Sequence, residues 1–223
     1  MSKFRCQQNG DSAEVWIYAE IGEGWGWGIS AKDFADEINA LDVSDLTVHI
    51  NSPGGDVFDG VAMHTVLKRH KAAVTVTIDG LAASAASLVA MAGDNIEIAQ
   101  GAFVMVHHPW TFGMGNASEF REIADQLEKI GESLVRIYAE RTDNTETRVR
   151  EWLDAETWMD SDEAVSNGFA DALTDQPAIA ASVDKRLFAH APDRLQVAAK
   201  ISKPAPAAWR LAAAERALTF MRG

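Results

Sequence analysis

The sequence has one cysteine, Cys6, and no hydrophobic run that approaches the ~18 consecutive apolar residues of a membrane span. A single cysteine excludes an internal disulfide, and its position leads us to expect a frayed N-terminal segment in a protein from a reducing compartment. The first residues also lack the apolar core of a secretory signal. We therefore expect a cytoplasmic protein without a membrane partner.

Basic residues are also scarce, with 20 Lys and Arg against 33 Asp and Glu, which gives a formal net charge of −13 over 223 residues. The exception is the stretch 184–223, which holds eight basic residues and only three acidic ones. The rest of the chain is therefore strongly acidic and repels nucleic acid at long range, so we expect no nucleic-acid partner.

The hydrophobic pattern predicts an α/β protein in which strands alternate with helices. A hydrophobic content of 47% is enough for one compact core. We expect strands at 13–22, 46–50, 73–80, 95–99 and 102–108, and helices at 31–41 (capped by Ser30), 57–70, 82–91, 116–141, 145–154 and 161–168.

The C-terminal part differs in composition from the part before it. We predict one domain over residues 1–175 and a basic extension rich in Ala and Pro over 176–223. Within this extension, "ISKPAPAA" (201–208) has the composition of a linker and "AWRLAAAERALTFM" (208–221) that of a short helix.

The stretch "DGLAASAASLVAMAG" (79–93) places Ser84 near a strand-to-helix junction. Backbone N–H groups at a helix start have no partner within the helix, so they can stabilise an oxyanion, and the flanking alanines let a peptide backbone approach the hydroxyl. The alternative is a capping serine on an alanine-packed helix. Ser87 fits a packed structural hydroxyl. The absence of a G-x-S-x-G motif argues against an α/β-hydrolase.

A serine nucleophile needs a base, and "AFVMVHHP" offers His107 and His108 at the end of an apolar strand. Successive side chains of a strand point to opposite faces, so only one of the two can face Ser84. The same alternation argues against a metal-binding pair, and we predict no metal site. The motif "NSPGGD" (51–56) can turn a backbone N–H toward a substrate, although a plain turn explains it as well.

Taken in order, "INSPGG", "GLAASAAS", "MVHHP" and "DEAVSNGFAD" resemble the Clp proteolytic-subunit family of serine peptidases over about residues 14–173. The wording "NSPGGDVFDG", "DGLAASAAS", "GNA" and "ETWM" is similar to the phage branch of that family, the head maturation (prohead) proteases.

The resemblance implies roles for individual residues. It makes Ser84 the nucleophile and His107 the base, and it assigns the oxyanion hole to the N–H groups of Gly55 and Ala85. Glu156 occupies the place where these peptidases usually have Asp, and Asp154 is the alternative triad acid.

The resemblance also implies an α/β fold of the Clp and crotonase type, a spiral of ββα units with a long handle helix and, here, a C-terminal extension. It implies a cofactor-free serine endopeptidase that forms a homo-oligomeric ring and acts on polypeptides, here scaffold or capsid proteins inside a phage prohead. Whether an ATPase docks is left open. Three alternatives remain: a crotonase, a Ser–Lys signal-peptide peptidase, and a catalytically weak capsid-assembly protein.

Overall fold

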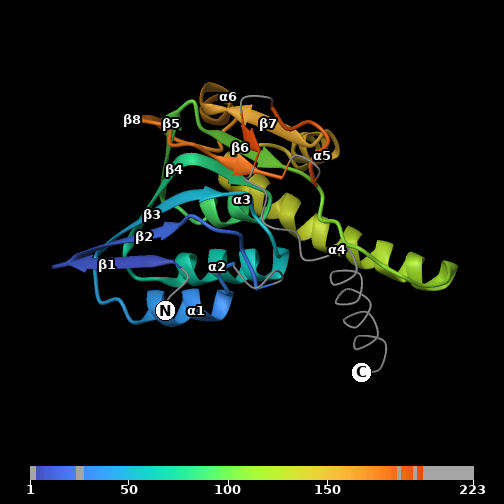
Figure 1. Cartoon of the computed structure of the whole chain (residues 1–223), viewed down its shortest axis with the longest axis horizontal. Coiled ribbons are helices and arrows are strands. Elements are labelled where there is room, and N and C mark those ends of the chain that lie inside the picture. The colour runs from blue at the N-terminus through green and yellow to red at the C-terminus, as the bar shows by residue number, and fades with distance from the viewer. Residues whose placement is uncertain (1–3, 24–27, 185–186, 193–194, 198–223) are drawn as a thin grey trace.

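The computed structural model describes residues 4–23, 28–184, 187–192 and 195–197. Strands and helices alternate along most of the chain (Figure 1). Their order is β1 (Arg5–Asn9), β2 (Ser12–Ile17), α1 (Ala31–Asn39), β3 (Asp45–Ser52), α2 (Val57–Arg69), β4 (Ala73–Ala83), α3 (Ala85–Ala90), β5 (Asn95–Gln100), β6 (Phe103–Val106), α4 (Ala117–Thr142), α5 (Glu146–Asp154), β7 (Thr157–Asp160), α6 (Ser161–Ser166), β8 (Ala172–Pro177), β9 (Ser182–Val183) and β10 (Gln196–Val197).

The main sheet has the strand order β1-β2-β3-β4-β5-β8, with β6 and β7 as a side branch. Strands β2 to β5 run parallel, and α1, α2 and α3 lie against one face of the sheet (Figure 1). Parallel neighbours need such crossover helices, which explains the alternating pattern of the sequence. The predicted α/β class is therefore confirmed.

The N-terminal segment is a strand, so the prediction of a frayed end at Cys6 is wrong. β1 pairs antiparallel with β2, and Cys6 is half-buried against the main core. The turn between them contains Gly10 at φ 64°, a conformation that glycine adopts without steric cost. The sequence "QNGDS" carries this hairpin signal, and sequence analysis missed it.

Strand β4 does not end at Gly80, as predicted, but continues to Ala83. Its first half pairs with β5 through Thr75–Ile78, and its second half, Leu81–Ala83, pairs with β6. The second partner keeps the chain extended beyond the glycine. Helix α3 is consequently shorter than the predicted 82–91 and begins directly after Ser84.

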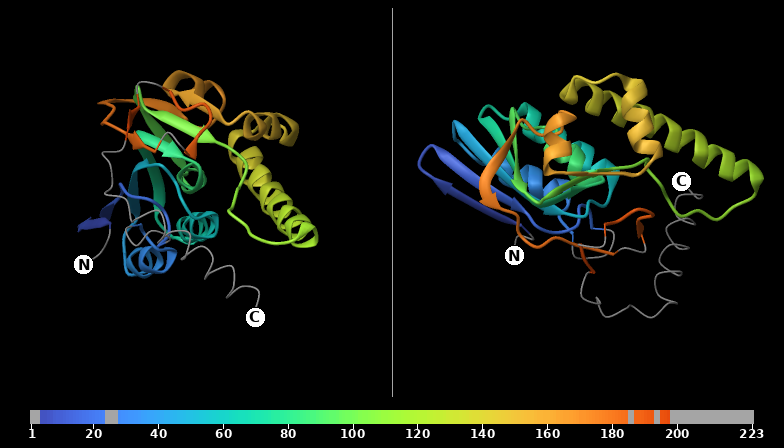
Figure 2. Two further views of the ribbon diagram at one scale, coloured as in Figure 1. Left: turned by 45° about the vertical axis from the view of Figure 1, so that its right-hand side comes forward. Right: turned by 90° about the horizontal axis from the view of Figure 1, so that it is seen from above.

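The long helix α4 matches the predicted 116–141 closely and is capped by Asn116, whose side chain accepts hydrogen bonds from the N–H groups of Ser118 and Glu119. Only its C-terminal half packs on the core, through Leu134, Val135 and Tyr138. The N-terminal half extends away from the body (Figure 2).

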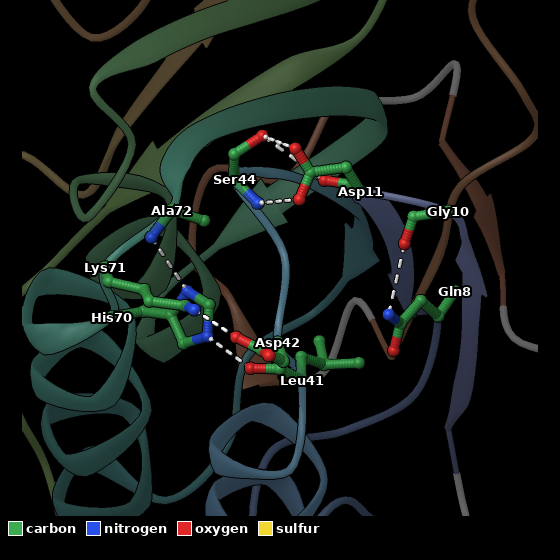
Figure 3. A network of polar contacts seen from close by, with 9 residues as sticks. All are labelled: Gln8, Gly10, Asp11, Leu41, Asp42, Ser44, His70, Lys71 and Ala72. Carbon is green, nitrogen blue, oxygen red and sulfur yellow. Dashed lines mark hydrogen bonds and ion pairs between the residues drawn. The ribbon is translucent and has the colours of Figure 1, made fainter.

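Polar contacts tie together the loops at the end of the sheet where β3 and β4 begin (Figure 3). The N–H and hydroxyl of Ser44 donate to the Asp11 carboxylate at 3.2 and 2.8 Å, which joins the β1–β2 turn to the start of β3. Lys71 forms an ion pair with Asp42 across the neighbouring loops. Ser84 lies at the opposite end of these strands.

Two hydrophobic clusters stabilise the described part of the chain. The larger fills the space between the sheet and the helices. The smaller joins Leu81, Ala83, Phe103 and Met105 of β4 and β6 to Ala181, Val183 and Leu195. Residues beyond β8 therefore pack on the sheet. The predicted linker 201–208 and helix 208–221 lie outside the described residues.

Among the described residues, no helix is long and apolar enough to cross a bilayer.

We expect Phe169→Ala to lower the free energy of unfolding by about 3–5 kcal/mol, because the fully buried ring packs on Tyr138 and Trp152 at centroid distances of 5.7 and 5.4 Å. Phe58→Ala removes the same kind of ring from a site that is 67% exposed, so it should change the free energy of unfolding by no more than about 0.5 kcal/mol. Urea unfolding measures both, and equal losses would contradict this view of the core.

Candidate functional site

Ser84 occupies a strained turn between β4 and α3, with φ 52° and ψ −125°. Such angles cost a non-glycine residue of order 1–3 kcal/mol and persist only where the surroundings enforce them. The turn is fixed on one side by β6, because the Ser84 N–H donates to the Met105 carbonyl at 2.9 Å. The result is a sharp strand-to-helix turn that presents a serine, formed here without the G-x-S-x-G pattern.

The small residues around Ser84 allow a second loop to approach it. A Cβ atom at Gly54 would lie 2.4 Å from the Ala83 carbonyl oxygen and 2.8 Å from Ser84 Cβ. A Cβ at Gly60 would lie 3.0 Å from the Cβ of Ala85. The loop that begins α2 therefore packs directly against the serine turn, and larger side chains would separate them.

The structure brings His107 to Ser84, with 2.8 Å between the Nε2 and Oγ atoms. His107 follows β6, the strand that pairs with the end of β4, so sheet pairing sets this distance. Burial lowers the pKa of His107 below its ordinary value; the negative charge of Glu156 raises it in part, and His108 lowers it further. The imidazole is therefore neutral at pH 7 and can accept the proton of Ser84.

Glu156 lies between α5 and β7 at φ 47° and interacts electrostatically with His107. Its carboxylate accepts hydrogen bonds from the N–H groups of His190 (2.8 Å) and Ala189 (3.0 Å) and from the Trp158 indole (3.3 Å). Among the described residues, no hydrogen bond joins it to His107. Burial acts to raise the pKa of Glu156, but these donors and His107 together hold it below its ordinary value.

Asp154 is placed elsewhere, with its carboxylate 2.8 Å from Nε2 of His108. Both side chains are exposed, while His107 is half-buried. The two histidines thus contact different groups, as the alternation of side chains along a strand predicts. Within the described part of the chain, no three His, Cys, Asp or Glu side chains gather to hold a metal ion.

Gly55 and Ala85 lie on the two loops that meet at Ser84. The neighbours of Gly55 bond to Ile21: the carbonyl of Gly54 accepts from its N–H, and the Asp56 N–H donates to its carbonyl. The N–H of Gly55, at φ 145°, is not part of this pairing. Ala85 is the first residue of α3, where N–H groups have no partner within the helix.

Two groups of contacts around the site were not predicted from the sequence. The Ser87 hydroxyl donates to the Ser84 carbonyl at 2.6 Å and lies 2.7 Å from the hydroxyl of the buried Tyr138, so the expectation of a structural Ser87 is confirmed. The second group comes from residues 188–190, which contact Glu156 and His107. No local pattern of the sequence indicates them.

A serine on a strained strand-to-helix turn, with a histidine nitrogen 2.8 Å from its hydroxyl, is the arrangement that serine hydrolases use. The Clp protease family matches residues 29–177. The chain therefore belongs to the Clp protease family.

Individual relatives agree with this membership. The chain is 35% identical to the ATP-dependent Clp protease proteolytic subunit of Chlorella vulgaris over 131 residues, which cover 57% of this chain and 65% of the relative. It is 31% identical to proteolytic subunit 2 of Synechococcus sp. (strain CC9605), with 61% and 71% covered. A solved structure of a ClpP1 mutant from Listeria monocytogenes matches at a TM-score of 0.64 and 26% identity, covering 73% of this chain and 91% of that one. The predicted Clp-like fold is confirmed.

We expect Gly54→Ala to be markedly more destabilising than Gly10→Ala. Both glycines have positive φ, at 89° and 64°, so both variants pay the backbone cost of about 1–2 kcal/mol. Only the methyl at residue 54 meets Ala83 and Ser84, whereas nothing lies within 4 Å of a Cβ at Gly10. Urea unfolding of the two variants measures the difference, and equal losses would show that the loops can separate at no cost.

Proposed function

We propose that this chain is a serine endopeptidase of the Clp type in which Ser84 is the nucleophile and His107 the general base. The observation that carries the proposal is the 2.8 Å contact between Ser84 Oγ and His107 Nε2 on a strained turn. Burial lowers the pKa of the half-buried His107 imidazole, so it is neutral at pH 7 and its Nε2 can accept the Ser84 proton.

The proposed reaction is acyl transfer to Ser84. His107 takes the hydroxyl proton as Oγ attacks a peptide carbonyl, and it then returns the proton to the leaving amine. The N–H groups of Gly55 and Ala85 bind the oxyanion from two sides. Water, activated by the same imidazole, releases the acyl group. This chemistry requires no metal or cofactor.

Glu156 is proposed as the acid that stabilises the His107 imidazolium. Its interaction with His107 is electrostatic, and its low pKa keeps it ionised at neutral pH. Asp154 is the weaker candidate, because its carboxylate pairs with His108 at an exposed position. An aspartate is the usual acid at this place in the family, and the longer glutamate side chain here is bonded mainly to backbone N–H groups.

Self-association through α4 is proposed as part of this function. The helix extends from the body (Figure 2). The exposed apolar side chains Phe112 and Met114 come just before it in the sequence, and Phe120 lies in its first turn. Exposed apolar side chains on a projecting helix favour contact between proteins. A ring of copies would enclose the Ser84 sites and restrict them to polypeptides that enter.

The finer assignment to phage head maturation rests on the wording of "NSPGGDVFDG", "DGLAASAAS", "GNA" and "ETWM" and stays a prediction. It makes scaffold and capsid proteins the substrates and places the enzyme in a prohead or the host cytoplasm. The relatives from Chlorella and Synechococcus are named ATP-dependent. Whether an ATPase serves this chain is a separate question, which a comparison of casein and folded substrates with and without ATP would answer.

We expect a fluorophosphonate to add one covalent mass to the protein and to add none to Ser84→Ala, as measured by intact mass spectrometry. His107→Ala should abolish the adduct, whereas His108→Ala should retain it, because only His107 lies within hydrogen-bond distance of Ser84. Absence of an adduct in the unmodified protein would favour the capsid-assembly alternative. A C-terminal mass loss repaired by Ser84→Ala would show self-cleavage of the basic tail.

The rate of labelling should fall at low pH with an apparent pKa below the ordinary histidine value of about 6.5, because burial opposes protonation of His107. Glu156→Gln removes a charge that raises this pKa, so its acid limb should move to still lower pH. The labelling rate of Glu156→Gln should also fall, by up to about 10⁴-fold, because the His107 imidazolium loses its stabilising charge.

Asp154→Asn is the control for this experiment, since Asp154 contacts His108 instead. Its acid limb should stay near that of the unmodified protein. Equal effects of Glu156→Gln and Asp154→Asn would contradict the assignment of Glu156.

A further inference from the structure

Residues 178–192 follow the part of the chain that matches the Clp protease family, which ends at residue 177. Of these, residues 178–184 cross the face of β4 and β6 that carries Leu81 and Met105, where Ala181 and Val183 join the smaller hydrophobic cluster. His107 lies on the same face, because side chains alternate along β6 and its continuation. A segment outside the shared region thus forms one wall of the proposed active site.

The beginning of this segment is anchored to the sheet. The Ile179 N–H donates to the Asp79 carbonyl at 2.7 Å, and the Asn51 amide donates to the Ala180 carbonyl at 3.1 Å. A Cβ at Gly80 would lie 2.6 Å from the Ile179 carbonyl oxygen, so the two backbones are in direct contact. The path of the segment is therefore fixed before it reaches the site.

Residues 188–190, here called the clasp, contact both members of the proposed His107–Glu156 pair. The Phe188 ring packs on the His107 imidazole at 5.9 Å between centroids and edge-on to Trp158 at 5.5 Å. The N–H groups of Ala189 and His190 each donate to one oxygen of the Glu156 carboxylate. The His190 ring in turn bonds to the Ala155 carbonyl at 3.1 Å.

These contacts restrict the Glu156 side chain more than a surface carboxylate would be restricted. Two backbone donors each bind one of its two oxygens, and the Trp158 indole adds a third bond. Backbone N–H groups carry no net charge and favour the ionised carboxylate. Phe188 at the same time packs against the imidazole. Orientation of charged groups in this manner is how active sites reduce reorganisation during reaction.

We propose that the clasp is a positioning element of the active site, in which the Ala189 and His190 N–H groups hold the Glu156 carboxylate and Phe188 orients His107. The inference rests on the proposed peptidase function. It goes further in one respect: the position of the Glu156 carboxylate depends on residues beyond 177, where the family match ends.

Proline substitutions in the full-length protein test the donors, because proline lacks an N–H. Ala189→Pro and His190→Pro each remove one hydrogen bond to Glu156. Ala191→Pro is the matched control in the same segment, since the N–H of Ala191 contacts no part of Glu156. Phe188→Ala tests the ring, with Leu187→Ala, at a 45% exposed neighbour, as its control.

We expect Ala189→Pro, His190→Pro and Phe188→Ala to slow fluorophosphonate labelling by at least about tenfold, since misplacement of a catalytic group can cost up to about 10²-fold. The two proline variants should also move the acid limb to lower pH, because Glu156 raises the pKa of His107 less when it is not held. In a Glu156→Gln background the same prolines should add little further loss. Ala191→Pro and Leu187→Ala should remain near the unmodified rate.

A structural role alone would give a different result, in which the prolines lower the fraction of labelled protein but leave the acid limb in place. That result, or additive losses in the Glu156→Gln background, would overturn the proposal. Faster labelling in Ala189→Pro or His190→Pro would overturn it as well, because it would show that the clasp keeps Glu156 from His107.

The His107 titration followed by NMR of histidine-labelled protein separates this inference from the proposed function, because it requires no activity. His107→Gln identifies the signal among the six histidines. A downward shift of the His107 pKa in Ala189→Pro but not in Ala191→Pro supports the clasp, even if the unmodified protein forms no adduct. An unshifted His107 pKa in Ala189→Pro, together with normal labelling of the unmodified protein, would overturn the clasp proposal but not the proposed peptidase function.

Discussion

The backbone of Gly54 lies against the Ser84 turn so closely that a methyl group at residue 54 would sit 2.4 Å from the Ala83 carbonyl oxygen. This contact needs glycine on one loop and small residues on the other. It also needs β4 to continue past Gly80 to a second partner, β6, which places His107 beside Ser84. The close approach of two backbones thus links the sheet topology to the serine, the histidine and the two N–H groups at Gly55 and Ala85.

Burial then sets the electrostatics of the pair. The half-buried imidazole of His107 has a lowered pKa, so it is a neutral acceptor at pH 7, while Glu156 is kept ionised by hydrogen-bond donors. The two shifts fit the roles proposed for these residues: a neutral imidazole is able to take a proton, and a carboxylate that could stabilise the resulting cation is already charged. In contrast, His108, next to His107 in the sequence, and Asp154, two residues before Glu156, are both exposed. Solvent weakens the interaction between them.

Local patterns predicted most of the elements and the stretches that carry the site. Alternation predicted that only one of the two histidines after β6 faces Ser84, the family resemblance selected His107, and the glycines of "NSPGGD" marked the loop that packs on Ser84. What failed depended on pairing at a distance. Gly80 has the features of a strand end, yet its neighbours pair with β6, and Cys6 belongs to a hairpin whose signal is the single Gly10 turn. A window of neighbouring residues does not contain the strand that overrides a local preference.

The contacts of Glu156 follow the same logic over a longer separation. Its partners Ala189 and His190 lie 33 and 34 residues further along the chain and use backbone N–H groups, which every residue except proline possesses. No side-chain motif encodes such a bond. The requirement is instead that the chain takes a fixed path across β4 and β6, and the apolar residues Ala181 and Val183 provide it by packing on Leu81 and Met105. Burial in the smaller cluster therefore places two generic donors at a specific carboxylate, which links hydrophobic packing outside the family region to the charge beside His107.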